Sequence, residues 1–92
     1  MILTVFDTET TGLNPDKHEI LQAGLLSLIL DRDGNHYILK EKEYKIKPER
    51  LDLASPRALQ VNGYTDSEWE GAPSFESVIE KMRPIIEESD VF

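Results

Sequence analysis

The hydrophobic pattern of the first half of the chain predicts three strands. Ile2–Phe6 is a short apolar run, rich in β-branched and aromatic residues and followed by polar ones, which predicts a buried β-strand. From Ile20 to Leu30 the chain is almost continuously apolar, and periodicity alone does not separate a strand from a helix there. The Asp31–Asn35 cluster favours a strand, because Asp-Gly between two such runs is a strong hairpin signal. We therefore predict a long central strand and an antiparallel partner from about His36 to Lys47.

The predicted third strand changes the face on which its apolar residues lie. Tyr37 and Leu39 occupy odd positions, whereas Tyr44 and Ile46 occupy even ones, so we expect a β-bulge around Glu41–Glu43. The polar positions of this strand include several lysines, which are Lys40, Lys42, Lys45 and Lys47. Lysine-rich strands are typical of protected sheet edges, and contact with phosphate groups is the alternative role for these side chains.

The second half of the chain carries helix signals. Ser55-Pro56 predicts an N-cap followed by proline at the first helical position, and Gly63 predicts the end of a short helix over 57–62. Thr65–Glu68 has the capping-box spacing for a second short helix that reaches Trp69.

A longer helix follows the cap residue Ser74. Its apolar residues fall at helical spacing, and they are Phe75, Val78, Ile79, Met82, Ile85 and Ile86. Pro84 removes one backbone hydrogen bond and is expected to bend the last turn. Val91-Phe92 has the composition of the start of a further strand. Strands followed by helices predict an α/β or α+β domain with mixed strand directions.

Composition narrows the class of protein. Ninety-two residues allow one small domain, and the absence of cysteine excludes disulfides and thiolate metal sites. The net charge of −8 argues against a simple electrostatic DNA-binding module, although bound cations can reverse the sign of a nuclease site. We find no signal-peptide pattern and no apolar run long enough to span a bilayer, so we expect a soluble, cytoplasmic protein that binds no membrane.

Two carboxylates follow the first apolar run. Asp7 and Glu9 lie two residues apart, so alternation along a strand points both side chains to the same face. Neighbouring carboxylates repel one another unless they are protonated, hydrogen-bonded or bridged by a cation, and an all-oxygen pair suits Mg²⁺ or Mn²⁺. A solvated strand end is the simpler explanation for an isolated Asp-x-Glu pair. The small residues that follow end in Gly12, which permits close approach by another group.

The longer string Phe6–Leu13 resembles the first motif of the DEDD (DnaQ-like) 3′–5′ exonucleases, the family of proofreading exonuclease subunits, and it matches that motif without a gap. Ala58–Thr65 resembles the family's helix that closes over the 3′-terminal nucleotide, with Asn62 where histidine is common. Ile20–Gly24 resembles the family's second strand, with Gln22 where glutamate is common.

This resemblance implies a ribonuclease-H-like mixed sheet and metal-dependent phosphodiester hydrolysis at the 3′ end of DNA, of the proofreading type, with two Mg²⁺ or Mn²⁺ ions. Asp7 would bridge the metals or bind one of them, and Glu9 would be a further ligand on the water-activating side. The residues implied to hold the substrate are Thr10, Thr11, Gly12, Leu13, Val61 and Asn62. The implied partners are a single-stranded or frayed 3′ end and, for a proofreading enzyme, a DNA polymerase.

The family's catalytic set is four carboxylates and a general-base histidine or tyrosine, of which this sequence matches two carboxylates. We therefore interpret residues 1–92 as the N-terminal part of a single exonuclease domain that does not hydrolyse DNA alone. In the family fold the first strand is interior, so we also expect an open strand edge here that pairs with a second copy or a complementing chain.

Two other functions stay open on the sequence. The chain could be a non-catalytic interaction module derived from the same family, or an unrelated small acidic domain in which Asp-x-Glu is incidental. The two histidines, His18 and His36, neighbour charged or turn residues, and we expect both to be exposed and outside catalysis. For Trp69 we expect packing of its short helix on the core, with base stacking as the alternative.

Overall fold

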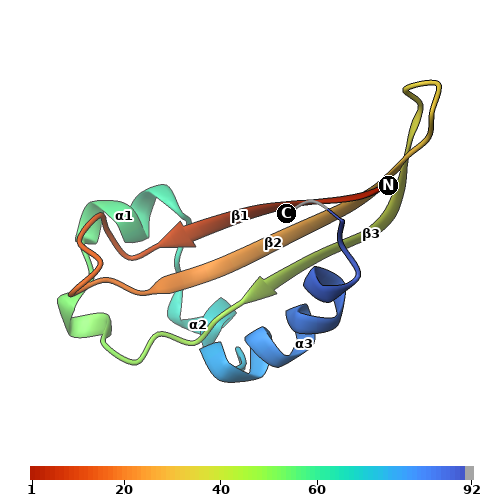
Figure 1. Cartoon of the computed structure of the whole chain (residues 1–92). Helices are drawn as coiled ribbons and strands as arrows, with labels where there is room; N and C mark the ends of the chain where they lie inside the picture. Colours follow the sequence, from red (N-terminus) through yellow and green to blue (C-terminus); the bar gives the residue numbers. More distant parts are fainter. Residues whose placement is uncertain (91–92) are drawn as a thin grey trace.

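The computed structural model describes residues 1–90 and contains one three-stranded antiparallel sheet with its helices in the second half of the chain. The strands lie in the order β1-β2-β3, which places β2 in the centre. The elements are β1 (Ile2–Thr10), β2 (Ile20–Leu30), β3 (His36–Lys45), the 3₁₀ turn η1 (Leu51–Leu53), α1 (Pro56–Val61), α2 (Asp66–Trp69) and α3 (Phe75–Glu87) (Figure 1). The three strands, the antiparallel hairpin and the later helices agree with the predicted ribonuclease-H-like α/β fold. The predicted mixed strand directions are not seen among the described strands, which all pair antiparallel, and the strand predicted at Val91-Phe92 lies outside the described residues.

The core lies between the central strand and α3, which runs along one face of the sheet (Figure 1). Alternate side chains of β2 are buried, as expected for a strand that turns one face toward a helix. Helix α3 contributes its buried positions at helical spacing. The buried cluster consists of Ala23, Leu25, Ile46, Val78, Met82 and Ile85.

Three side-chain caps begin the helices where the sequence predicts them. Ser55 Oγ accepts a hydrogen bond from the Ala58 N–H at 3.4 Å, and Thr65 Oγ1 accepts one from Glu68 at 3.2 Å. Ser74 Oγ likewise accepts from Ser77 at 3.2 Å. Each cap satisfies a backbone donor that the first helical turn leaves without a partner.

The β-bulge in β3 is two residues earlier than predicted. Ser27 pairs with Lys40 and Leu28 pairs with Ile38, so Leu39 is the extra residue, while Glu41 to Glu43 pair regularly with β2. The prediction of a bulge at Glu41–Glu43 is therefore wrong. Because the residues between Leu39 and Tyr44 are all charged, the apolar alternation does not mark where the face changes.

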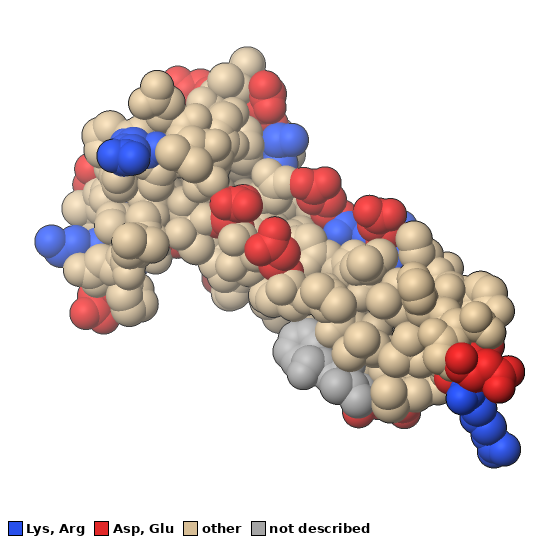
Figure 2. Space-filling view, turned by 90° about the horizontal axis from the view of Figure 1, so that it is seen from above, with Lys and Arg blue, Asp and Glu red and all other residues tan. Residues whose placement is uncertain are grey.

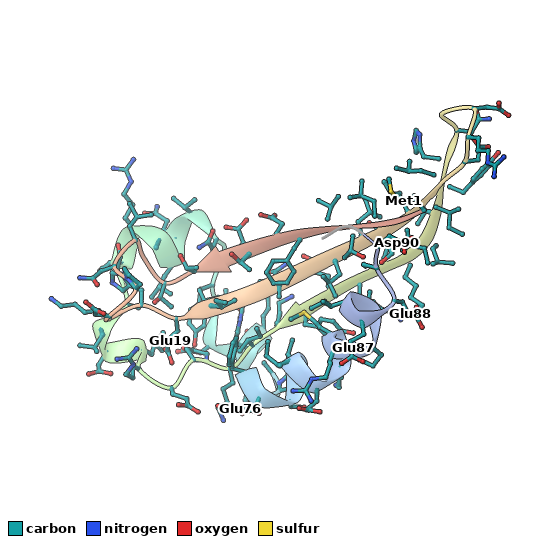
Figure 3. The ribbon with its side chains drawn as sticks, viewed as in Figure 1. Met1, Glu19, Glu76, Glu87, Glu88 and Asp90 are labelled. Atoms are coloured by element: carbon teal, nitrogen blue, oxygen red, sulfur yellow. The ribbon has the colours of Figure 1, made fainter. Side chains whose placement is uncertain are left out.

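The first strand is less buried than its composition predicts. Val5 is 47% exposed and Phe6 is 41% exposed, because β1 is an edge strand within residues 1–90 and the core lies over β2. Among the described strands, β1 is thus an outer strand of the sheet. At the start of that edge, the Asp90 N–H donates to the Ile2 carbonyl at 2.9 Å, and the Ile2 N–H donates to the Asp90 carboxylate at 2.7 Å (Figure 3).

The β2–β3 hairpin extends away from the helices and gives the molecule an elongated shape of 49 × 25 × 23 Å (Figure 1). Its turn is closed by Asp31, whose carboxylate accepts hydrogen bonds from the backbone N–H groups of Asp33 and Asn35, both at 2.9 Å. No helix within residues 1–90 has the length and apolar character needed to cross a membrane.

Candidate active site

The acidic pair lies near the carboxyl end of β1. Asp7 pairs across the sheet with Gly24, and Glu9 pairs with Gln22, so strand alternation places both carboxylates on one face. Both side chains are exposed. The position opposite Asp7 carries no side chain, which leaves space beside its carboxylate.

Behind the acidic pair, Thr11 anchors the end of the motif. Its N–H donates to the Glu19 carbonyl at 2.8 Å, its hydroxyl accepts from the Glu19 N–H at 2.9 Å, and its carbonyl accepts from the Ser55 N–H at 2.8 Å. The side chain is fully buried, with 0% of its surface exposed. Thr11 therefore holds the motif in place through its backbone and its buried hydroxyl, and its predicted role in substrate binding stays a prediction.

Helix α1 is attached to the same strand end through Asn62. The Asn62 Nδ2 group donates to the Thr10 carbonyl at 2.8 Å, and Thr10 Oγ1 donates to the Gly12 carbonyl at 2.8 Å. Asn62, which stands where the resembling family commonly has histidine, thus bonds to the protein's own backbone. This bond fixes α1, and Val61 with it, against the end of β1.

Glu19 connects the motif to the loop before α1, a role that no sequence signal indicated. One carboxylate oxygen accepts a hydrogen bond from the Glu49 N–H and the other from the Arg50 N–H, both at 2.9 Å. The Arg50 side chain in turn donates to the Asp16 carbonyl at 3.3 Å. Figure 3 places Glu19 at the end of the sheet where these loops meet. Because the charged Glu19 carboxylate accepts two backbone donors at once, it fixes the position of the loop at Glu49 and Arg50 relative to the motif.

A groove of about 580 Å³ joins the motif to α1. It brings together six of the predicted site residues, from two segments far apart in the sequence, and they are Glu9, Thr10, Gly12, Leu13, Val61 and Asn62. Leu13 is 100% exposed and Val61 is 74% exposed, so both present apolar surface to solvent. Arg57 adds a positive charge to the groove lining. An apolar pair with a cation nearby suits a ligand that combines a flat ring with a phosphate.

His18 is the second site residue that the sequence did not reveal. It was expected to be exposed, but it is half-buried and lies against Gly12 in the wall of the groove. The prediction fails because the turn at 14–18 folds the ring back onto the motif, as the hydrogen bond from the Asn14 N–H to His18 Nδ1 at 2.9 Å shows. His36, on β3, is exposed as predicted.

Trp69 is packed rather than available for stacking on a base. It is 3% exposed, and its Nε1–H donates to the Leu21 carbonyl at 3.0 Å. Lys45, one of the β3 lysines, lies 5.1 Å from the centre of the Trp69 ring. Lys40 forms an ion pair with Glu88 at 3.3 Å. These contacts agree with the structural role predicted for Trp69 and with edge lysines that pack on the protein's own surface.

The carboxylates Asp7 and Glu9 fit a divalent cation by the type of their donor atoms, since hard cations take oxygen ligands. Within residues 1–90, no three His, Cys, Asp or Glu side chains form a group that could hold a metal ion. No larger cluster of such side chains therefore accompanies Asp7 and Glu9 in the described part of the chain. In Figure 2, acidic side chains gather near the middle of the surface, and a broad neighbouring area carries no charged group.

The comparisons with known proteins include a family model, a curated relative and a solved structure. The family model described as "Exonuclease" (RNase T) matches residues 4–92. The chain is 34% identical over 85 residues to the PolC-type DNA polymerase III of Thermotoga petrophila, covering 92% of this chain and 6% of the polymerase. A solved structure described as "3'-end specific recognition of histone mRNA stem-loop by 3'-exonuclease" matches with a TM-score of 0.73 and 21% identity, covering 94% of this chain and 30% of that one.

The structural match supports the fold, and the family model, which covers nearly the whole chain, supports the assignment made from Phe6–Leu13. The chain spans only a small part of both matched proteins. Exonuclease domains of this kind generally use divalent metal ions, in keeping with the donor atoms of Asp7 and Glu9. The chain belongs to the exonuclease family.

Proposed function

We propose that this chain is the N-terminal part of a 3′–5′ exonuclease domain that hydrolyses the terminal phosphodiester bond of a nucleic acid. The observation that carries the proposal is the groove that places Glu9 beside Leu13, Val61 and Asn62. A metal-binding carboxylate and exposed apolar side chains in one groove can hold a terminal nucleotide next to its scissile phosphate.

Asp7 and Glu9 are the residues that would hold the cations, from one face of β1. When bound, two divalent cations supply activation of the attacking water and stabilisation of the departing 3′ oxygen. Leu13 and Val61 pack on the terminal base from the two walls of the groove, and Arg57 contributes charge toward a phosphate. Thr10 and Gly12 line the same groove, and the Thr10 hydroxyl donates a hydrogen bond to the Gly12 carbonyl.

For the substrate, we propose the 3′ end of single-stranded or frayed DNA, in association with a DNA polymerase and in the cytoplasm. The similarity to a PolC-type DNA polymerase III supports this choice. The matched 3′-exonuclease structure concerns recognition of a histone mRNA stem-loop, so RNA is the competing substrate. Matched DNA and RNA oligonucleotides of the same sequence separate the two.

A non-catalytic interaction module is the second candidate. This candidate is favoured because residues 1–90 hold no group of three or more possible metal ligands, so Asp7 and Glu9 stand as a pair. Under the primary proposal the remaining carboxylates come from the C-terminal part of the domain. Under the alternative, no added segment restores hydrolysis.

The test is cleavage of a 3′-labelled oligonucleotide in Mn²⁺ by the chain alone and by the chain mixed with the C-terminal half of a family exonuclease domain. We expect hydrolysis in the mixture alone, and a loss of about a thousandfold in Asp7→Asn, which corresponds to about 4 kcal/mol of transition-state stabilisation. Asp16→Asn is the matched control, since Asp16 is an exposed carboxylate in the loop at 14–18. Near-native activity of Asp7→Asn contradicts the assignment, and inactivity of every mixture supports the interaction module.

A further inference from the structure

A single imidazole contacts both neighbours of the exposed Leu13. On one side, the ring of His18 lies over Gly12, where a Cβ atom would be 2.3 Å from both Cε1 and Nδ1 of the ring. Such a distance is far inside van der Waals contact, so the ring occupies the space that any other side chain at position 12 would need. The absence of a side chain at Gly12 is therefore what allows His18 to pack there.

On the other side of Leu13, Asn14 and His18 bond to each other twice. The Asn14 N–H donates to His18 Nδ1 at 2.9 Å, and the His18 N–H donates to the Asn14 carbonyl at 2.8 Å. Nδ1 is thus the acceptor of a backbone donor, and this bond orients the ring. The Asp16 N–H adds a bond to Asn14 Oδ1 at 2.9 Å, so the turn is closed by its own residues.

Leu13 is thus held at both flanking residues while its side chain is 100% exposed. Exposed loops are ordinarily mobile, and ordering a loop when a ligand binds weakens the affinity. A loop that is already fixed presents its apolar side chain without that loss. The free energy that would order the loop is then available for binding.

We propose that His18 is a positioning residue, which fixes the loop Gly12–Asn14 so that Leu13 is preorganised against the 3′-terminal nucleotide. The inference rests on the proposed function of the groove for its ligand, but the fixing of the loop can be measured without any nucleic acid. His18 acts through Gly12 and Asn14 and touches none of the reacting atoms in this role.

A double-mutant cycle between positions 12 and 18 isolates the contact. We expect Gly12→Ala to displace the ring, expose the Asn14 amide to hydrogen exchange and weaken binding of a 5′-fluorescein-labelled pentathymidylate in Mg²⁺ by roughly tenfold. In a His18→Ala background the same change at Gly12 should have almost no further effect. An effect of Gly12→Ala that is equally large in both backgrounds overturns the proposal.

Conservative variants separate the two contacts of the ring. His18→Asn can place its Oδ1 near the position of Nδ1, so we expect the Asn14 amide to stay protected from exchange. His18→Phe keeps a ring over Gly12 but offers no acceptor, so the same amide should exchange faster. His36→Asn, at the exposed histidine of β3, is the matched control and should alter neither readout.

The two readouts distinguish failure of the inference from failure of the proposed function. If the wild-type chain does not bind the oligonucleotide, the groove assignment fails, and the exchange data still decide whether His18 fixes the loop. If the wild-type chain binds but His18→Phe leaves both Asn14 exchange and affinity unchanged, the positioning role is refuted. Amide protection of β2 in each variant verifies that the fold is intact.

Discussion

The two ends of the sheet are built from different interactions. At the motif end, side chains from distant segments bond the backbone, with Glu19 on the Glu49 and Arg50 N–H groups and Asn62 on the Thr10 carbonyl. At the other end, the β2–β3 hairpin extends beyond the helices (Figure 1). Its apolar side chains are exposed there, with 58% of the surface of Tyr37 and 65% of that of Ile38 accessible. The side-chain bonds of the hairpin turn stay within Asp31–Asn35, whereas those of the motif end join a strand, a loop and a helix, and such fixing of separate segments suits a binding site.

The core between the two ends should give the largest effect on stability. Met82 is 2% exposed, and we expect Met82→Ala to lower the free energy of unfolding by about 3 kcal/mol through lost burial and the cavity that remains. The matched change in the hairpin, Ile38→Ala, should cost about 0.5 kcal/mol or less, because its side chain is largely in water already. Urea denaturation measures both, and similar values for the two variants would contradict this division of the molecule.

Glu19 comes next, because its carboxylate accepts two backbone donors at once. We expect Glu19→Ala to cost about 2 kcal/mol and to increase hydrogen exchange at Glu49 and Arg50. Glu49→Ala, which removes an exposed carboxylate in the same loop, is the control and should change stability little. If the two variants denature alike, Glu19 does not hold the junction.

Asn62 should give a smaller effect, with one hydrogen bond from a half-buried amide. We expect Asn62→Ala to lower the free energy of unfolding by about 1 kcal/mol and to loosen α1 from the end of β1. The hairpin offers a comparison in Asn35, whose side chain donates to Asp31 at 3.2 Å in an exposed turn. A larger loss for Asn35→Ala than for Asn62→Ala would reverse the proposed order of the two ends.

The smallest effect concerns the pH dependence of the hairpin turn. Desolvation is the largest single effect and raises the pKa of Asp31, but hydrogen bonds from the Asn35 side chain and from the Asn35, Asp33 and Gly34 N–H groups together outweigh it, and the pKa is lowered overall. A lowered folded-state pKa gives stability that is present above the unfolded value and is lost as pH falls through the folded value, below about pH 4. Amide shifts of Asp33 and Asn35 between pH 6 and pH 2 should follow this titration, and in Asp31→Asn they should not.

The sequence predicted the parts of the fold that depend on local signals. The caps Ser55, Thr65 and Ser74 and the Asp-Gly turn each rest on residues within a few positions of one another, and all are confirmed. The position of the bulge was missed, because a run of charged residues carries no information on which face is buried.

In the candidate site, the acidic pair and the groove residues were predicted from the resemblance of Phe6–Leu13 and Ala58–Thr65 to the family, whereas Glu19 and His18 were not. Glu19 accepts hydrogen bonds from residues 30 and 31 positions away, so neither its sequence neighbours nor its spacing indicates the contact. His18 bonds within its own turn, but its packing on Gly12 depends on how that turn folds back. The sequence around a histidine does not show whether its side chain is half-buried, as in His18, or exposed, as in His36.

We propose above that Asp7 and Glu9 bind a divalent cation at the motif end of the sheet. A Mn²⁺ titration, followed by paramagnetic broadening of backbone amides, tests this binding most directly. We predict selective broadening around residues 7–9 in the wild-type chain, its loss in Asp7→Asn, and no change in Glu41→Gln, which alters an exposed carboxylate of β3. Broadening in Asp7→Asn at the same residues and the same Mn²⁺ concentrations as in the wild-type chain would contradict the account.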